Sequence, residues 1–129
     1  TRFMITLDEA VRFVSYALKD MQGGEIYVKK LPSMNIMDIA KAIDPRFKYK
    51  LIGIRSGEKL HEQMISQEDS ENTYEYKDYY KIIEKHNLKR KNFLKSKKVK
   101  SSFCYSSESN KKWMSSNSLK TILKKDKIL

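Results

Sequence analysis

Cysteine, proline and glycine are scarce in this sequence, which has one cysteine, two prolines and four glycines among its 129 residues. The single Cys104 cannot form an internal disulfide, and no cysteine and histidine cluster has the spacing of metal ligands, so we expect neither a disulfide nor a zinc site. A chain of this length makes one modest domain, since single domains usually have about 100–150 residues. The sequence therefore excludes a second full catalytic domain.

Long apolar runs are also absent. No apolar segment approaches the roughly 18–20 residues that a membrane-spanning helix needs, and the first ten residues lack the basic and then apolar layout of a signal peptide. Charged residues make up 33% of the sequence and its mean hydropathy is −0.69, which is the balance of a water-exposed protein. We therefore predict a cytoplasmic protein that does not contact a membrane.

Positive charge is concentrated in the last third of the sequence. The net charge is +11, yet residues 1–84 contain 13 Lys and Arg against 14 Asp and Glu, whereas residues 85–129 contain 14 against two. We interpret residues 1–84 as a near-neutral folded unit, residues 85–102 as a basic flexible connector, and residues 103–129 as a C-terminal strand and helix extension. Function is expected in the first unit.

The first unit begins with a well-marked helix. Thr6 and Glu9 have the spacing of a capping box, which predicts a helix from about residue 7, and Gly23 and Gly24 end it. The expected buried face of this helix recurs at helical spacing: Ala10, Val11, Phe13, Val14, Ala17, Leu18 and Met21. Residues 25–31 contain β-formers bounded by glycine and proline, so they predict a strand.

A second helix is expected before the Asp44-Pro45 pair, capped by Ser33 or Asn35. Its expected buried face consists of Ile36, Ile39, Ala40 and Ile43. Further along we expect strands at residues 50–54, 79–83 and 103–106, a short third helix with Leu60, Met64 and Ile65 on one side, and a capped helix over residues 115–125. These elements together predict an α/β (α+β) fold.

Four segments resemble the C-terminal, substrate-binding part of extended short-chain dehydrogenase/reductase enzymes that act on nucleotide sugars. They are TRFMITLDEAV, GGEIYVKKLPSMNIMDIAKAI, IGIRSGEKLHEQMIS and NTYEYKDYYKI, all within residues 1–84, and CYSSESNKKWMSSNSLKTIL resembles the tail of the same enzymes. The resemblance is greatest to the inverting UDP-N-acetylglucosamine 4,6-dehydratases of bacterial polysaccharide and flagellin-glycan biosynthesis. It implies a substrate-binding subdomain without its N-terminal Rossmann domain.

The resemblance implies three residues that bind UDP. Arg55 resembles the arginine of an Arg-Pro-Gly-Glu segment that holds the diphosphate, Glu58 the acid that receives the ribose hydroxyls, and Arg2 an arginine that contacts the nucleotide diphosphate. The chemistry suits these roles, because a guanidinium can form two parallel hydrogen bonds with phosphate and a carboxylate can accept from a diol. Gly57 would allow a tight turn. Ser56 stands where the family has proline, which should loosen that turn.

The catalytic half of such an enzyme is missing from this sequence. The resemblance implies an NAD(P) site on a Gly-rich turn and a catalytic Tyr-x-x-x-Lys, but the four glycines cannot form that turn and none of the eight tyrosines has a lysine four residues later. We therefore expect no catalytic residue and no cofactor site on this chain. It would be an inactive fragment, with NAD(P) bound by the missing N-terminal Rossmann domain, and a separate polypeptide that supplies this domain is one candidate partner.

Two alternatives stay open at this stage. The related UDP-sugar 4-epimerases share the same architecture, so the sequence does not separate a dehydratase from an epimerase, nor does it identify the sugar. Intact relatives are implied to form homo-oligomers. A second class of function is a non-enzymatic module whose basic residues 85–129 bind polyanions. Nucleic acid is not expected as a partner, because aromatic residues for base stacking are sparse in that segment.

Overall fold

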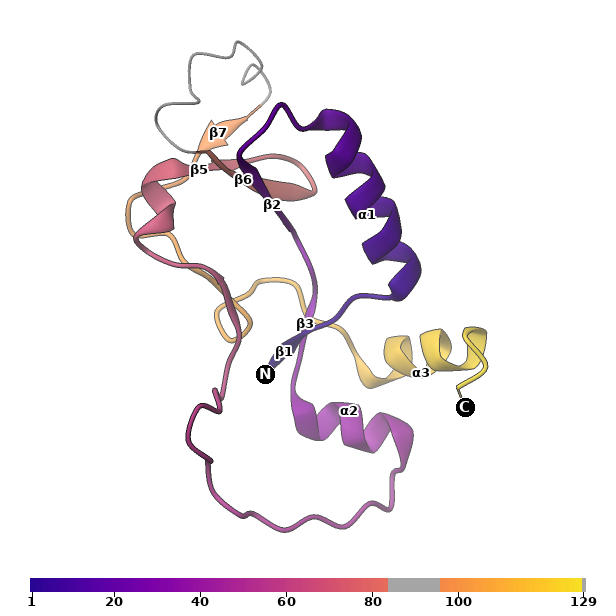
Figure 1. Cartoon of the computed structure of the whole chain (residues 1–129). Coiled ribbons are helices and arrows are strands. Elements are labelled where there is room, and N and C mark those ends of the chain that lie inside the picture. The colour runs from indigo at the N-terminus through magenta and orange to yellow at the C-terminus, as the bar shows by residue number, and fades with distance from the viewer. Residues whose placement is uncertain (84–95, 129) are drawn as a thin grey trace. The chain divides into compact units, whose positions relative to one another are not determined.

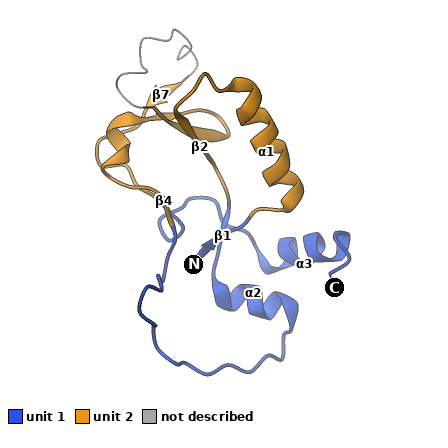
Figure 2. Ribbon diagram, in the orientation of Figure 1, with its two compact units in different colours: residues 1–4, 32–62, 106–129 blue, residues 5–31, 63–105 orange. Residues whose placement is uncertain are grey.

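The structure is a computed structural model that describes residues 1–83 and 96–128, and the chain forms two compact units (Figures 1 and 2). Unit 1 consists of residues 1–4, 32–62 and 106–129, and unit 2 of residues 5–31 and 63–105. Helices and strands occur together, which confirms the mixed α/β class. None of the helices in the described part has the length and apolar character of a membrane span.

Unit 2 begins with helix α1 (Leu7–Asp20), whose predicted capping box is confirmed. The backbone N–H of Glu9 donates to Thr6 Oγ1 at 3.2 Å, and the backbone N–H of Thr6 donates to Glu9 Oε2 at 3.3 Å. These reciprocal bonds satisfy N–H groups that have no partner inside the first turn of a helix, which is why the helix begins here.

The sheet of unit 2 has four antiparallel strands in the order β2-β6-β5-β7. The strands are β2 (Glu25–Lys29), β5 (Thr73–Glu75), β6 (Tyr79–Ile83) and β7 (Lys97–Lys98). The predicted strands at 25–31 and 79–83 are confirmed. Strand β5 is preceded by the short 3-10 helix η1 (Asp69–Asn72). Two further strands, β4 (Gln63–Ile65) and β8 (Tyr105–Ser106), do not belong to this sheet.

The predicted connector at residues 85–102 falls mainly on residues 84–95, which lie outside the described part. Lys97 and Lys98 pair with Glu75 and Tyr74, so the last part of the predicted connector is a strand and this part of the prediction is wrong. The predicted strand at 103–106 is confirmed only for its second half, as β8, since residues 103 and 104 are not part of a strand. The functional division into residues 1–84, 85–102 and 103–129 otherwise stays a prediction.

The predicted buried face of α1 is only partly correct. Ala10, Phe13 and Ala17 are half-buried, and Phe13 makes ring contacts with Tyr27 of β2 and Tyr79 of β6. The other predicted members are exposed: Val11 at 56%, Val14 at 57%, Leu18 at 66% and Met21 at 42%. The apolar surface of α1 is therefore wider than the area that the sheet of unit 2 covers.

Unit 1 is organised around strand β3 (Ser33–Met34), which pairs antiparallel with β1 (Arg2–Phe3) and precedes helix α2 (Ile36–Ile43). Unit 1 also contains helix α3 (Ser116–Lys125), which is capped by Ser115 as predicted. The core consists of the buried Met34, Ala42 and Leu119, packed against Met4, Ile39, Met114 and Leu123.

Helix α2 is capped by Asn35, whose Oδ1 accepts from the N–H of Met37 at 2.8 Å. Ile39 and Ala40 are half-buried as expected, but Ile36 and Ile43 are 56% and 53% exposed, so that part of the predicted buried face is wrong. The helix has only eight residues, and the face that packs on the core passes through Ala42 and Ile39, so the residues at its two ends project beyond the core.

Two predicted elements are absent between α2 and β4. Residues 50–54 do not form a strand, because within the described residues no other strand pairs with them, and an isolated strand leaves its backbone groups unsatisfied. The predicted third helix is also wrong, since Leu60 lies in a loop and Met64 and Ile65 belong to β4. Residues 44–62 instead form a long loop, which in Figure 1 extends from the end of α2.

Candidate functional site

The candidate site lies on this loop of unit 1, residues 44–62. Residues 48–60 are exposed along their whole length, including apolar Leu51, which is 86% exposed, and Ile52, which is 68% exposed. A long exposed loop without secondary structure is unusual inside a compact unit and often carries function. The loop contains both Arg55 and Glu58, so the structure places these two predicted site residues together.

Arg55 and Glu58 are the first and last residues of a tight turn. The backbone N–H of Glu58 donates to the carbonyl oxygen of Arg55 at 3.1 Å, and Gly57 has a φ of 85°. Ser56 has no positive φ, so the conformation is that of a type II turn with glycine at its third position. A Cβ atom on Gly57 would meet nothing within 4 Å, so glycine is required for the backbone conformation and not for space.

The side chain of Glu58 closes the same turn. Its Oε2 accepts a hydrogen bond from the backbone N–H of Arg55 at 2.9 Å. A carboxylate has about four acceptor positions, so one such bond leaves room for further donors such as a diol. Within residues 1–83 and 96–128, no hydrogen bond or ion pair holds the guanidinium of Arg55, and this exposed cation can bind an anion from solution.

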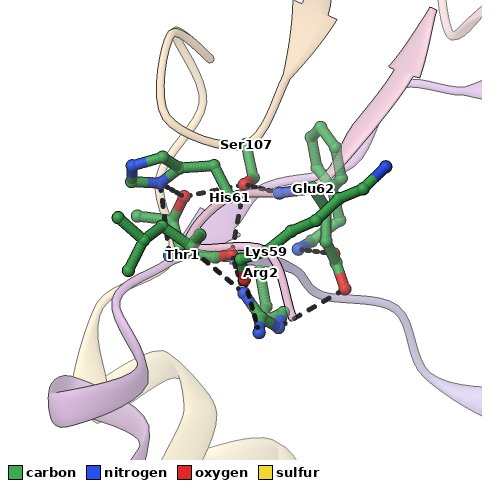
Figure 3. Close-up of polar contacts among 8 residues, drawn as sticks. Thr1, Arg2, Lys59, His61, Glu62 and Ser107 are labelled. Atoms are coloured by element: carbon green, nitrogen blue, oxygen red, sulfur yellow. Dashed lines mark hydrogen bonds and ion pairs between the residues drawn. The ribbon is translucent and has the colours of Figure 1, made fainter. Parts of the chain in front are cut away.

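Arg2 lies at the C-terminal end of the same loop, as Figure 3 shows. Its Nη1 donates to the carbonyl oxygens of Thr1 at 2.8 Å and Leu60 at 3.1 Å, and its Nη2 donates to that of Lys59 at 3.2 Å. Its Nε lies 3.5 Å from Glu62 Oε1. The guanidinium therefore joins strand β1 to the end of the loop that carries Arg55 and Glu58.

A network of polar side chains surrounds this junction (Figure 3). Thr1 Oγ1 lies 2.9 Å from His61 Nδ1 and 2.7 Å from Ser107 Oγ, and the backbone N–H of Glu62 donates to Ser107 Oγ at 2.9 Å. His61 Nε2 lies 2.8 Å from Glu108 Oε2. The network fixes the loop end to β1 and to residues 107–108.

Sequence reasoning missed His61, Glu62 and Ser107 as parts of the site. Ser107 is more than 40 residues from the loop end and joins it only in the folded unit, so spacing gives no signal for it. His61 and Glu62 lie inside the segment IGIRSGEKLHEQMIS that carries the resemblance, and this position is the signal that could have identified them. Within the described residues, no group of three or more His, Cys, Asp or Glu could hold a metal ion.

Several known proteins are similar to this chain. A UDP-N-acetylglucosamine 4,6-dehydratase (inverting) from Campylobacter jejuni serotype O:2 is 47% identical over 131 residues, covering 95% of this chain and 39% of that relative. The enzyme of the same name from C. jejuni serotype O:23/36 is 44% identical with the same coverage. A UDP-glucose 4-epimerase from Rickettsia canadensis is 38% identical over 86 residues, which are 64% of this chain and 25% of that relative.

A crystal structure of Pen from Bacillus thuringiensis has the same fold over 98% of this chain, with a TM-score of 0.80 and 24% sequence identity. The matched region is 39% of that protein. The chain thus spans about two fifths of the length of the dehydratases and of this structure, and in the dehydratases it matches the C-terminal part.

The family model for polysaccharide biosynthesis proteins matches residues 1–84. These residues include β1, the whole loop 44–62 and the turn between Arg55 and Glu58. The predicted resemblance is thereby confirmed, and the chain belongs to the polysaccharide biosynthesis protein family.

Proposed function

We propose that this chain is the C-terminal, substrate-binding part of a nucleotide-sugar-modifying enzyme of bacterial polysaccharide or glycan biosynthesis, similar to UDP-N-acetylglucosamine 4,6-dehydratase (inverting). The observation that carries this proposal is the 47% identity to such an enzyme over 95% of the chain. On this proposal the chain binds the UDP part of the substrate and is inactive alone.

The loop 44–62 is the proposed UDP site. The guanidinium of Arg55 would form charge-assisted hydrogen bonds with the diphosphate, each roughly twice as strong as a neutral hydrogen bond. The Glu58 carboxylate would accept from the ribose hydroxyls, and Arg2 would contribute positive charge at the end of the loop. The exposed Arg55 guanidinium and the turn that brings Glu58 beside it support these assignments.

The NAD(P) that the family implies does not fit the residues of this chain. A dinucleotide site needs a Gly-rich turn that leads from a strand into the N-terminus of a helix. Here Gly23 and Gly24 lead from helix α1 into strand β2, and Gly53 and Gly57 lie in the exposed loop 44–62. We therefore assign no step to the cofactor on this chain and propose that the N-terminal part of the enzyme holds it.

A UDP-sugar 4-epimerase is the second candidate. The observation that favours it is the 38% identity to the UDP-glucose 4-epimerase of Rickettsia canadensis over 86 residues. Both candidates share the proposed UDP site, so the product formed by the complete enzyme, a 4-keto-6-deoxy sugar or a 4-epimer, distinguishes them.

The proposal is tested by titrating the purified chain with UDP, with uridine as the reference ligand, and following backbone amide chemical shifts. We expect weak binding of UDP that is tighter than binding of uridine, with shifts at residues 55–59. Equal affinity for the two ligands, or no binding of UDP, would refute the assignment of the loop as a diphosphate site.

Replacing Ser56 by proline should strengthen UDP binding. Ser56 is the second residue of a type II turn, where proline fixes the required φ, and no described residue accepts a hydrogen bond from its N–H. Such substitutions stabilise the compatible conformation by about 0.4–1 kcal/mol, which corresponds to a roughly 2- to 5-fold gain in affinity. Calorimetric titration of Ser56→Pro against Ser56→Ala measures this effect, and a loss of affinity in the proline variant would contradict it.

We further propose that the exposed face of α1 packs against the N-terminal part that the longer relatives possess. Leu7, Val11, Val14 and Leu18 follow one another at spacings of four, three and four residues and are 80%, 56%, 57% and 66% exposed. An apolar stripe of this kind on a helix is typical of a surface that is covered in a larger assembly.

Val14→Lys is expected to reduce the self-association of the isolated chain without lowering its thermal stability, because Val14 is mostly exposed in unit 2. Light scattering as a function of concentration measures the association, and Ser15→Lys is the matched control because Ser15 is exposed on the same helix but outside the stripe. Equal self-association of the two variants would show that the apolar stripe of α1 does not mediate the association.

A further inference from the structure

Both the side chain and the backbone of Glu62 make hydrogen bonds at the end of the loop 44–62. Its Oε2 accepts from the backbone N–H of Phe3 at 2.9 Å, and its Oε1 lies 3.5 Å from Arg2 Nε. Its own backbone N–H donates to Ser107 Oγ at 2.9 Å, and its carbonyl oxygen accepts from the N–H of Ser107 at 2.8 Å. The carboxylate therefore has a fixed direction, with one oxygen turned toward Arg2.

The guanidinium of Arg2 is held by this carboxylate together with three backbone carbonyl oxygens. Arginine has a long side chain with about 2 kcal/mol of rotamer entropy, so it points in one direction only when several partners hold it. Glu62 pairs with Nε, while Nη1 donates to the carbonyl oxygens of Thr1 and Leu60 and Nη2 donates to that of Lys59, so Glu62 is the charged partner that sets the Nε edge of the guanidinium. Arg2, Glu62 and the end of the loop are thus joined by mutual polar contacts (Figure 3).

The ion pair itself contributes little to folding stability. The side chains of Arg2 and Glu62 are 40% and 44% exposed, and pairs with this exposure usually contribute less than about 1 kcal/mol. An acid beside a site for a diphosphate would also repel the ligand. An acid whose ion pair contributes little to stability and whose charge is unfavourable to the ligand is better explained by the geometry that it imposes.

We propose that Glu62 is a positioning residue for the UDP site: it orients the Arg2 guanidinium and fixes the end of the loop that carries Arg55 and Glu58. This inference rests on the proposed function, because it concerns how that site is held in shape. It can be tested on this chain, since all the residues concerned lie in unit 1.

Glu62→Gln tests the inference, because glutamine keeps the length of the side chain and can still accept from the N–H of Phe3, but it has no charge facing Arg2. We expect a 5- to 10-fold loss of UDP affinity with no change for uridine, which has no phosphate. Arg2→Gln should give a similar loss, and the double variant should be no weaker than either single variant, as coupled residues require. Glu68→Gln, the loss of an exposed acid in unit 2, is the control.

The outcomes distinguish a failure of the positioning role of Glu62 from a failure of the proposed UDP-binding function. A gain in UDP affinity in Glu62→Gln would show that the acid only repels the ligand, and an equal loss for UDP and uridine would show a general structural defect; either result overturns the inference. An unchanged affinity in a chain whose UDP binding still requires Arg55 overturns the inference alone. Failure of the unsubstituted chain to bind UDP overturns the proposed function, and this inference with it.

Discussion

Arg55→Ala is expected to abolish measurable binding of UDP to this chain. The guanidinium is exposed, and within the described residues it has no ion pair that would compete with a ligand. Hydrogen bonds to charged groups contribute about 1.5–3 kcal/mol each, so the loss of a two-bond contact with phosphate weakens binding by roughly 100-fold or more. Binding that is weak at the start then falls below detection, which calorimetric or chemical-shift titration measures.

Arg46→Ala is the matched control for this substitution. Arg46 lies in the same loop, is exposed, and carries the same charge, but it lies outside the turn between Arg55 and Glu58. General attraction between a basic loop and a nucleotide would weaken binding equally in the two variants. A selective loss in Arg55→Ala supports a specific contact, whereas UDP affinity that is unchanged in Arg55→Ala removes the phosphate assignment.

Elements that depend on neighbouring residues could be predicted from the sequence. The start of α1 follows from the bonds between Thr6 and Glu9, and the start of α2 from the Asn35 cap, because each cap satisfies backbone groups within three residues. Strand 50–54 was predicted wrongly for the opposite reason. A strand needs a partner, and local propensity at Leu51 and Ile52 contains no information about whether a partner is present.

In the candidate site, too, the features that depend on neighbouring residues could be predicted, and those that depend on distant residues could not. The turn from Arg55 to Glu58 is local, so its glycine and its acid could be identified from four consecutive residues. The contacts of Arg2 with the carbonyl groups of Lys59 and Leu60 join positions almost 60 residues apart, and they follow from the packing of unit 1. The sequence predicted that Arg2 belongs to the site, but only the fold shows that it holds the loop.

Asp20→Ala is expected to destabilise the chain, because it breaks an ion pair inside unit 2. Lys81 Nζ lies 2.5 Å from Asp20 Oδ2, and the hydroxyl of Tyr27 donates to the same oxygen at 2.7 Å. The Lys81 side chain is only 10% exposed, so the variant leaves a buried ammonium group without its counter-charge. We expect a loss of about 2–3 kcal/mol in the free energy of unfolding, at the lower end for such pairs because Asp20 is 35% exposed and partly screened by solvent.

Urea unfolding measures this loss, and Asp78→Ala, the loss of an exposed acid in the same unit, is the control. The variant Lys81→Met combined with Asp20→Ala should recover much of the stability, since removing both charges costs far less than leaving one of them unpaired. If the double variant is as unstable as Asp20→Ala, the ammonium group is not the cause, and the loss must come from the hydrogen bond of Tyr27.

The same ion pair predicts how stability depends on pH. Burial acts to raise the pKa of Asp20, but the hydrogen bonds from Lys81 and Tyr27 outweigh it, and the pKa is lowered. The contribution of Asp20 to folding stability is therefore present above the unfolded-state pKa of about 3.9 and is lost as the pH falls through the folded-state pKa. Burial acts to lower the pKa of Lys81, but the bond to Asp20 raises it, so the contribution of Lys81 is present below about pH 10.4 and is lost at higher pH. Burial raises the pKa of Tyr27 to about 12, which adds to the alkaline loss. The difference in unfolding free energy between the wild-type chain and Asp20→Ala should therefore be nearly constant from about pH 4 to pH 10 and shrink on both sides, and a difference that instead varies across neutral pH would exclude this ion pair as its source.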